Sequence, residues 1–378
     1  MPPMTRKDQM PNLKFISSCL LIASIHANAD AIMETATAAS DKPYALSLSY
    51  AFETSGALQG GLDRKLNFTG NLLIDARFDL SSLPHLSGLS AYVQGVGIHG
   101  DSLSESVGDT QVSSNIDAPK AARVYQAWLQ KEFADGAFSL LAGIHDLNSE
   151  FYSTDASRIF LNSSFGVGPD LSHTGVNGPS IFPEPGMAVR ARVRPISDWE
   201  ISTAMYDGNP GGTPWVSEDG GLGILELAHA QKIHDLDGRY ALAAWGYTAQ
   251  NRTRGAYFLA NQKIYSPTSI APRGLSAFVR AGLSDRGSVS SSWATGLNYT
   301  GAIAMRDEDQ LGFAIAQAKG VGEEGEELAR ETALELTYLV KLKPWFSVQP
   351  DVQWILNPGM DSTAATALVR AVRLQVVF

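Results

Sequence analysis

The chain has 378 residues, of which 44% are hydrophobic, and a formal net charge of −10. This length suits two soluble domains or one large barrel, and the net acidity argues against a nucleic-acid-binding protein. The single cysteine, Cys19, excludes a disulfide scaffold and a cysteine-based metal site.

The N-terminus has the pattern of a secretory signal peptide. A basic start precedes an apolar stretch and a small-residue cleavage motif: Arg6, Lys7 and Lys14, then Phe15–Ile25, then Ala27-Asn28-Ala29. The apolar stretch is shorter than the ~20 residues that a membrane-spanning helix needs. We therefore expect residues 1–29 to be removed and 30–43 to form a short N-terminal segment. A buried first helix is the alternative.

From residue 44 onward, apolar residues alternate with small or polar ones at period two, which predicts β-strands with two different faces. Within 66–80, for example, Ile74 lies on one face, and Asp75 and Arg77 lie on the other. The alternation predicts sixteen strands, and an even number suits a closed antiparallel barrel. The predicted strands are 44–52, 66–80, 89–98, 122–133, 138–145, 188–194, 199–207, 222–232, 239–248, 255–265, 275–284, 290–300, 310–319, 332–341, 345–356 and 368–378.

The connections between these strands fall into two groups. Those after even-numbered strands include the short ones 134–137, 195–198, 233–238 and 343–344; the long ones, 99–121, 146–187 and 208–221, follow odd-numbered strands. This asymmetry is typical of barrels in bacterial outer membranes. In hydrocarbon, only helices and closed barrels pair all their backbone groups. We therefore predict an all-β transmembrane antiparallel barrel over 44–378, wide enough for a water-filled lumen. A soluble β-sandwich or β-helix is the alternative, because its inner faces also alternate.

Aromatic residues are predicted at several strand ends, where membrane barrels carry interfacial girdles. They are Tyr44, Phe52, Trp199, Tyr265, Trp345 and Phe378. A last strand that ends in a terminal Phe is a mark of outer-membrane barrels, and by resemblance to that class it is expected to engage the barrel-assembly machinery. Farther upstream, Val289, Trp293 and Leu297 are predicted to share one outer face.

The sharpest chemical feature is the stretch Val189-Arg190-Ala191-Arg192-Val193-Arg194. An arginine that faces lipid at the midplane costs about 2–4 kcal/mol, so Arg190, Arg192 and Arg194 should point into the lumen. They could donate hydrogen bonds to hydroxyl groups and attract anions, or they could pair with acidic loop residues. Both interpretations stay open. Arg77 and Arg280 are also predicted to line the pore.

The longest predicted connection, 146–187, is expected to be functional, because structureless loops of that length usually are. It carries carboxylates and amides that suit sugar hydroxyls, and aromatic rings that suit the C–H faces of sugars. The candidate ligand-binding residues are Glu150, Asn162, Asp170, Asn177 and Glu184. We predict that this loop folds inward as a constriction; a lid outside the barrel is the alternative.

Motifs of the common enzyme families are absent: the sequence has no Gly-x-Ser-x-Gly, no His-Glu-x-x-His and no phosphate-binding loop. Its seven histidines show no metal-ligand spacing. We therefore expect no catalysis, no cofactor and no metal. The acidic run Glu323, Glu324, Glu326 and Glu327 is most simply a solvated loop, although it could bind divalent cations near lipopolysaccharide.

Several motifs resemble the carbohydrate-selective outer-membrane porin family, in order, over about residues 120–378. They are Tyr125-Gln-Ala-Trp-Leu-Gln-Lys131, Ala142–Phe151, Leu161–Asp170, Asn177–Pro183, Tyr206–Gly211, Ala260–Lys263, Glu335–Tyr338 and Asn357–Gly359. The resemblance implies a sixteen-stranded barrel in the Gram-negative outer membrane that passes glucose-like sugars by diffusion through an arginine-rich constriction. A general diffusion porin with a basic, anion-favouring eyelet is the main alternative, and a barrel enzyme or adhesin is a third. Expected partners are small sugars, outer-membrane lipid, lipopolysaccharide and the barrel-assembly machinery, but no nucleic acid.

Overall fold

The computed structural model describes residues 43–212, 214–215, 219–249, 252–267, 273–322 and 327–378. The predicted signal peptide 1–29 lies outside the described residues, as do residues 30–42 and residues 323–326 of the acidic run.

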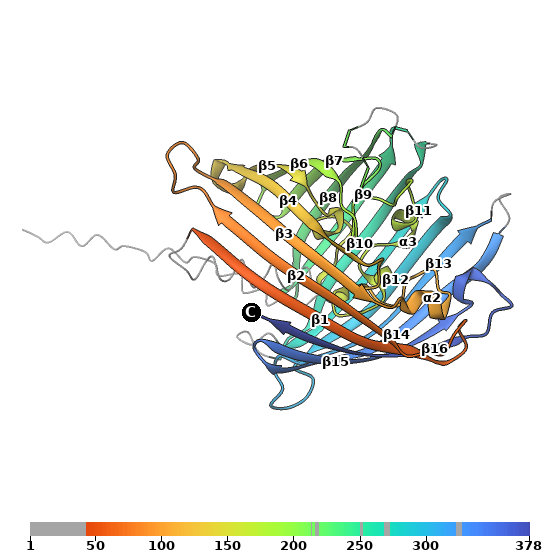
Figure 1. The fold of residues 1–378 in the computed structure, drawn as a ribbon. Coiled ribbons are helices and arrows are strands. Elements are labelled where there is room, and N and C mark those ends of the chain that lie inside the picture. Colours follow the sequence, from red (N-terminus) through yellow and green to blue (C-terminus); the bar gives the residue numbers. More distant parts are fainter. Residues whose placement is uncertain (1–42, 213, 216–218, 250–251, 268–272, 323–326) are drawn as a thin grey trace, which may run out of the picture.

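The described chain forms one closed antiparallel barrel of sixteen strands, each paired with its neighbours in sequence (Figure 1). The pairing of β1 with β16 closes it, from Ser49–Val377 to Gln59–Leu368. The strands are β1 Tyr44–Gln59, β2 Asn67–Asp79, β3 Leu89–Gly100, β4 Ala121–Phe133, β5 Phe138–Ile144, β6 Met187–Ile196, β7 Trp199–Asp207, β8 Gly221–Ile233, β9 Leu236–Tyr247, β10 Arg254–Tyr265, β11 Gly274–Ser284, β12 Val289–Thr300, β13 Gln310–Val321, β14 Glu327–Lys343, β15 Phe346–Leu356 and β16 Ala367–Val377. The predicted fold class is confirmed.

Strand bounds differ from the prediction mainly at β1, which continues to Gln59 rather than ending at residue 52. The stretch 53–59 has no alternating apolar face, so the sequence pattern ends early. Backbone pairing nevertheless continues, because Thr54 lies opposite Phe68 on β2 and Val372 on β16. β14 likewise begins at Glu327 instead of residue 332, and β16 ends one residue before Phe378.

The two faces of the strands follow the predicted alternation. On β2 the side chain of Ile74 is 53% exposed on the outside, whereas its neighbour Asp75 is fully buried inside. Trp293 and Leu297 also face outward, but Val289 does not: it is buried against Ala318 inside the barrel. The reason is a bulge between Val289 and Ser291, which shifts the alternation by one residue.

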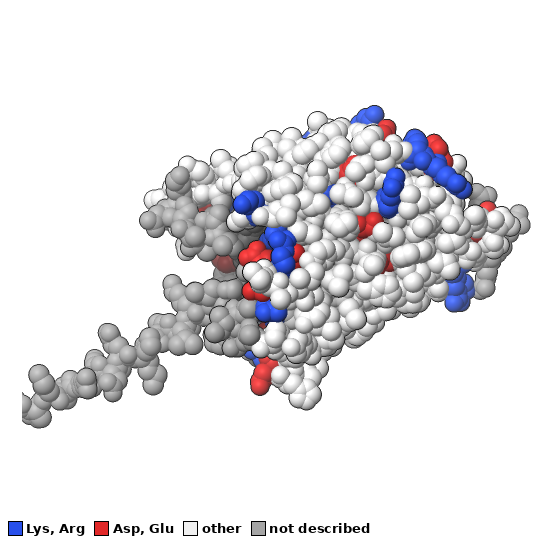
Figure 2. Space-filling model, turned by 90° about the horizontal axis from the view of Figure 1, so that it is seen from below, with Lys and Arg blue, Asp and Glu red and all other residues white. Residues whose placement is uncertain are grey.

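The outer wall has the character of a membrane-facing surface. In Figure 2, large stretches of the visible wall carry no charged residue. At the barrel end where β1 begins, exposed aromatic residues gather as predicted, and the rings of Trp345 and Phe378 stack with centroids 6.3 Å apart. Phe52 is an exception, because β1 continues to Gln59 and Phe52 lies within the strand. Tyr44 and Tyr265 lie exposed at the same end. Figure 1 shows the C-terminus beside β1, and the backbone of Phe378 exchanges two hydrogen bonds with Leu48.

Short helices lie in the long connections: α2 Leu103–Val107 between β3 and β4, and η2 Leu147–Ser149, η3 Asp155–Ser157, η4 Ser163–Phe165 and α3 Pro169–Ser172 between β5 and β6. Single turns η1 Ala134–Gly136 and η6 Pro358–Met360 lie in shorter connections. No helix within the described ranges is long and apolar enough to cross a membrane.

The connection 145–186 folds into the barrel. Its residues Leu147, Phe151 and Leu171 are fully buried and pack in one cluster with Tyr206 of β7 and Tyr257 of β10, which belong to the inner wall. The loop therefore lies inside the lumen, as predicted, and does not form an external lid. This placement brings loop side chains onto the inner faces of distant strands.

Candidate functional site

The arginine ladder, Arg190, Arg192 and Arg194, lies on the inner face of β6, as the cost of arginine in lipid predicts. Val189 is 51% exposed on the outer wall, whereas Arg190 is fully buried inside. The register is therefore the predicted one. The side chains of Arg192 and Arg194 are 22% and 49% exposed, so the ladder becomes more accessible along the strand.

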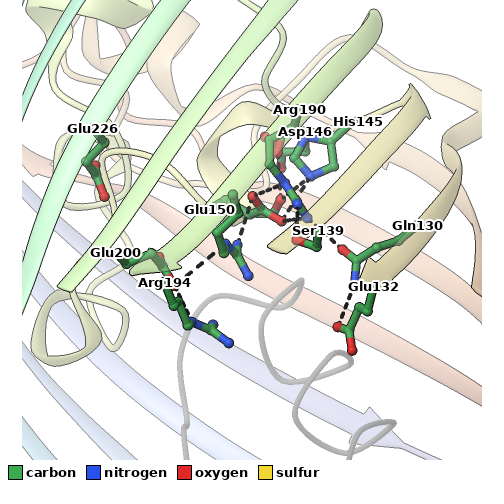
Figure 3. A network of polar contacts seen from close by, with 12 residues as sticks. Gln130, Glu132, Ser139, His145, Asp146, Glu150, Arg190, Arg194, Glu200 and Glu226 are labelled. Atoms are coloured by element: carbon green, nitrogen blue, oxygen red, sulfur yellow. Dashed lines mark hydrogen bonds and ion pairs between the residues drawn. The ribbon is translucent and has the colours of Figure 1, made fainter. Parts of the chain in front are cut away.

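Arg190 is enclosed by partners from two strands and the loop (Figure 3). Its guanidinium forms an ion pair with Glu150 of the inward loop at 2.8 Å. It also donates hydrogen bonds to Gln130 of β4 at 2.6 Å and to Ser139 of β5 at 2.7 Å. Charge-assisted bonds of this kind are strong, and together they offset the cost of burying the charge.

The next two rungs are paired as well. Arg192 reaches Glu150 at 2.9 Å, so one loop carboxylate serves two arginines. Arg194 donates to Glu200 of β7 at 3.0 Å, and Arg192 lies 3.7 Å from the same carboxylate. The predicted pairing with acidic loop residues is therefore observed for Glu150, whereas the second carboxylate, Glu200, comes from strand β7 of the wall.

The pairing continues around the wall. Arg239 of β9 donates to Glu226 of β8 at 2.6 Å, and Gln130 donates to Glu132. We call the whole set the charged network: Arg190, Arg192, Arg194, Arg239, Glu132, Glu150, Glu200 and Glu226. Each of the four arginines has a carboxylate partner, and Glu132 accepts from Gln130. The four arginines and four glutamates together carry no net charge when all are ionised.

The electrostatics of the loop keep this balance at neutral pH. Burial alone would raise the pKa of Glu150, but the nearby charges of Arg192 and Arg190 and the hydrogen bond from Arg190 hold it below its usual value. Burial lowers the pKa of His145 to about 4, against the opposing pull of Glu150. Glu150 is therefore ionised and His145 neutral at pH 7. The histidine hydrogen-bonds with the Tyr206 hydroxyl at 2.9 Å.

Arg280 does not belong to this group. It is buried on β11, where its guanidinium donates to the backbone carbonyls of Phe165 and Gly166 and lies 4.8 Å from the centre of the Tyr152 ring. All three partners belong to the inward loop. The structure thus places Arg280 at a contact between wall and loop, away from the accessible rungs of the ladder.

Asp170 and Asn162 occupy similar contacts. Asp170 accepts hydrogen bonds from Tyr152 at 2.8 Å and from Ser292 of β12 at 2.5 Å. The backbone N–H of Asn162 donates to Glu335 of β14 at 3.0 Å. The loop is therefore fastened to β11, β12 and β14, on the wall opposite to the ladder.

The remaining candidates lie elsewhere. Arg77 of β2 sits 5.6 Å from the centre of the Tyr92 ring. Asn177 donates to Asn209 in the next long connection at 2.7 Å, and Glu184 pairs with Arg123 at the start of β4. Of the ten residues selected from the sequence, the structure brings Glu150 together with the ladder, and Arg280 together with Asp170 around the Tyr152 side chain.

Sequence reasoning missed three partners of the ladder, Gln130, Ser139 and Glu200. It also missed the other members of the charged network, Glu132, Glu226 and Arg239. All of them lie at inward-facing positions of predicted strands, so the alternation of apolar and polar residues could have identified them. It missed Glu335 as a loop-binding residue for a different reason, since nothing local marks a carboxylate that accepts two backbone N–H groups. Within the described part of the chain, no group of three or more His, Cys, Asp or Glu side chains is placed to hold a metal ion.

Comparison with known proteins agrees with this architecture. The family model described as "Carbohydrate-selective porin, OprB family" matches residues 63–253 and 246–378. Porin B of Pseudomonas aeruginosa is 24% identical and the match covers 89% of this chain and 88% of that protein; the putative porin QuiX of Acinetobacter baylyi is 22% identical, with 89% of each covered.

Solved structures share the fold. The high-pH structure of Pseudomonas putida OprB superposes with a TM-score of 0.81 at 20% identity, covering 91% of this chain and 96% of that one. OmpT, an outer-membrane protein of Vibrio cholerae, superposes with a TM-score of 0.55 at 10% identity, covering 89% and 97%. The family match spans most of the chain, and the barrel, its inward loop and its outer wall fit the same assignment. The chain therefore belongs to the carbohydrate-selective porin family, OprB, and is a β-barrel channel of the Gram-negative outer membrane.

Proposed function

We propose that this porin passes neutral, glucose-like sugars by diffusion between the inward loop and the arginine ladder. The observation that carries the proposal is the pairing of Glu150 with both Arg190 and Arg192. A ladder neutralised in this way offers donors and acceptors for hydroxyl groups without attracting one sign of charge. Passage needs no catalytic step, and the family is one of channels.

The balance of charge separates this proposal from its main alternative. A general diffusion porin with an anion-favouring eyelet would need guanidinium groups that face the lumen uncompensated. Here the two most accessible rungs, Arg192 and Arg194, each have a carboxylate within 3.0 Å. A paired guanidinium keeps spare N–H donors, because it has five, and those suit hydroxyl oxygens.

The ten selected residues divide into two proposed roles. Arg190, Arg192, Arg194 and Glu150 line the passage or hold its lining in place, with Arg77 on the neighbouring wall and Asn177 and Glu184 towards the outer entrance. Arg280, Asn162 and Asp170 act indirectly by fastening the loop. Outer-membrane lipid and lipopolysaccharide around the wall, and the barrel-assembly machinery at the C-terminal strand, remain proposed partners.

Liposome swelling tests the function. Vesicles that contain the purified channel should swell faster in glucose than in sodium gluconate, a charged solute of similar size. Equal rates for both solutes, or faster entry of gluconate, would favour the anion-preferring general porin instead.

A further inference from the structure

A row of paired inward-facing residues crosses the wall beside the charged network. Through successive strand pairs it runs Arg77, Tyr92, Trp128, Gly143 and Ala188, from β2 to β6. Trp128 stands at its centre, one inward position before Gln130, which binds Arg190. The arginine ladder therefore begins next to a tryptophan in which sequence reasoning saw no role.

The two cross-strand neighbours of Trp128 differ. On β3 the ring of Tyr92 lies 5.1 Å from the indole, and Tyr92 is fixed in turn by a 2.6 Å hydrogen bond to Asp75. On β5 the partner is Gly143, which has no side chain and a φ of +141° that disfavours any other residue. The indole thus packs against Tyr92 on one side. On the other side it has no cross-strand side chain but lies edge-on to the His145 ring, with centroids 6.5 Å apart, and it stays partly exposed.

The indole N–H of Trp128 is buried and has no hydrogen-bond partner in the described structure. An unpaired buried donor costs free energy, and tryptophan N–H groups usually find an acceptor. The site therefore calls for an oxygen atom from outside the protein. A water molecule or a hydroxyl group of a solute can supply it.

Polar groups flank the indole along β4. Gln126 and Gln130 occupy the inward positions on either side, and Gln130 accepts from Arg190 at 2.6 Å while donating to Glu132 at 3.2 Å. Gln126 donates to Gln94 at 3.1 Å. An aromatic face bordered by amides matches a pyranose ring, which has an apolar C–H face and a rim of hydroxyls.

We propose that Trp128 and Gln130 form a pyranose-binding subsite beside the constriction, with the indole as the stacking face and the buried Arg190 holding Gln130 in place. This inference rests on the proposed function and adds where a sugar pauses on its way through the pore. It also predicts a preference that charge balance alone does not give: a cyclic sugar should bind better than an acyclic polyol with similar hydroxyls.

The test measures block of the ion current through the purified channel in planar bilayers, with glucose and with sorbitol as probes. Trp128→Leu removes the stacking face and the N–H, whereas Trp128→Phe keeps an aromatic face. The matched control is Trp293→Leu, because Trp293 faces outward from β12 and is 40% exposed. Heat-modified migration on a gel confirms that each variant has folded.

We expect the half-blocking concentration of glucose to rise about fivefold in Trp128→Leu and about twofold in Trp128→Phe, in line with the strength of aromatic contacts. Block by sorbitol and the behaviour of Trp293→Leu should not change. Equal glucose affinity in wild type and both Trp128 variants would overturn the subsite, as would equal losses for glucose and sorbitol. If Trp128→Leu does not fold, Trp128→Phe decides alone.

These outcomes are distinct from failure of the proposed function. A wild-type channel that admits gluconate as fast as glucose contradicts the proposed function whatever the variants do. A wild-type channel that admits glucose selectively, but shows no saturable block by it, contradicts the subsite only.

Discussion

Two buried arginines on different parts of the wall, β6 and β11, show how one residue type serves two purposes in the same barrel. Arg190 and Arg280 both face inward and are at most 1% exposed. Arg190 is held by side chains, including a carboxylate that it shares with the more accessible Arg192. Arg280 is held by backbone carbonyls of the loop. The first belongs to a network that reaches the lumen, whereas the second fastens the loop that narrows it.

We expect the largest effect from a substitution of Arg280. In Arg280→Met, loop carbonyls lose their donors, and we expect the free energy of unfolding to fall by about 3 kcal/mol or more, since each unpaired buried polar group is costly. Single-channel currents should become larger and noisier as the loop loosens. Arg370→Met is the control, because Arg370 faces outward on β16. Quiet, wild-type currents from a folded Arg280→Met channel would show that the loop is held without this residue.

Substitutions in the arginine ladder should instead change the charge selectivity of the channel. Replacing Arg190 and Arg192 together with glutamine leaves Glu150 uncompensated, so the ratio of cation to anion permeability should rise by about threefold or more. Reversal potentials in a salt gradient measure this ratio. An unchanged ratio would remove both arginines from the pore wall.

Removing the carboxylate instead of the arginines should shift the charge selectivity in the opposite direction. Glu150→Gln removes the carboxylate shared by Arg190 and Arg192, so the permeability ratio should move towards anions by about twofold. The glucose preference in liposome swelling should weaken in parallel. A shift towards cations would contradict the neutralising role of Glu150. Glu105→Gln is a suitable control, because Glu105 lies exposed on α2.

A smaller effect is expected from pH. Glu150 has a pKa below its usual value, and His145 has a pKa of about 4, so neither changes charge between pH 7 and about pH 5. Below about pH 4 the histidine gains a proton and the carboxylate begins to lose its charge, so the permeability ratio should turn towards anions. In Glu150→Gln only the histidine titrates, and the acid shift should be smaller. A ratio that changes between pH 7 and pH 5 would point to other groups.

The smallest effect should come from Arg194→Gln. The side chain of Arg194 is 49% exposed, and exposed ion pairs contribute little and are screened by salt. We expect a slight cation shift at low ionic strength that disappears at high ionic strength. A large, salt-independent shift would mean that Arg194, rather than Arg190 and Arg192, dominates the lumen.

Much of the site could be predicted from the sequence wherever the alternation along a single strand decides which way a side chain points. Period two placed Arg190 and Arg192 inside, because the cost of arginine in lipid leaves one register. The same argument could not separate Arg280 from them, since inward parity does not reveal whether a loop or the lumen receives a side chain. Val289 shows the other limit: a single bulge reversed its face without a signal in the sequence.

What the sequence by itself determined was the barrel: its strands, their faces, the long fifth connection and the presence of arginines on the inner wall, because hydrocarbon and water impose a periodic pattern on every strand. What only the tertiary structure decided was the partner of each inward charge. Glu150 meets Arg190 across 40 residues of sequence, and Glu335 meets the N–H group of Leu161 across 174. Such contacts depend on where a long loop comes to rest inside a closed cylinder, and no local pattern encodes that position.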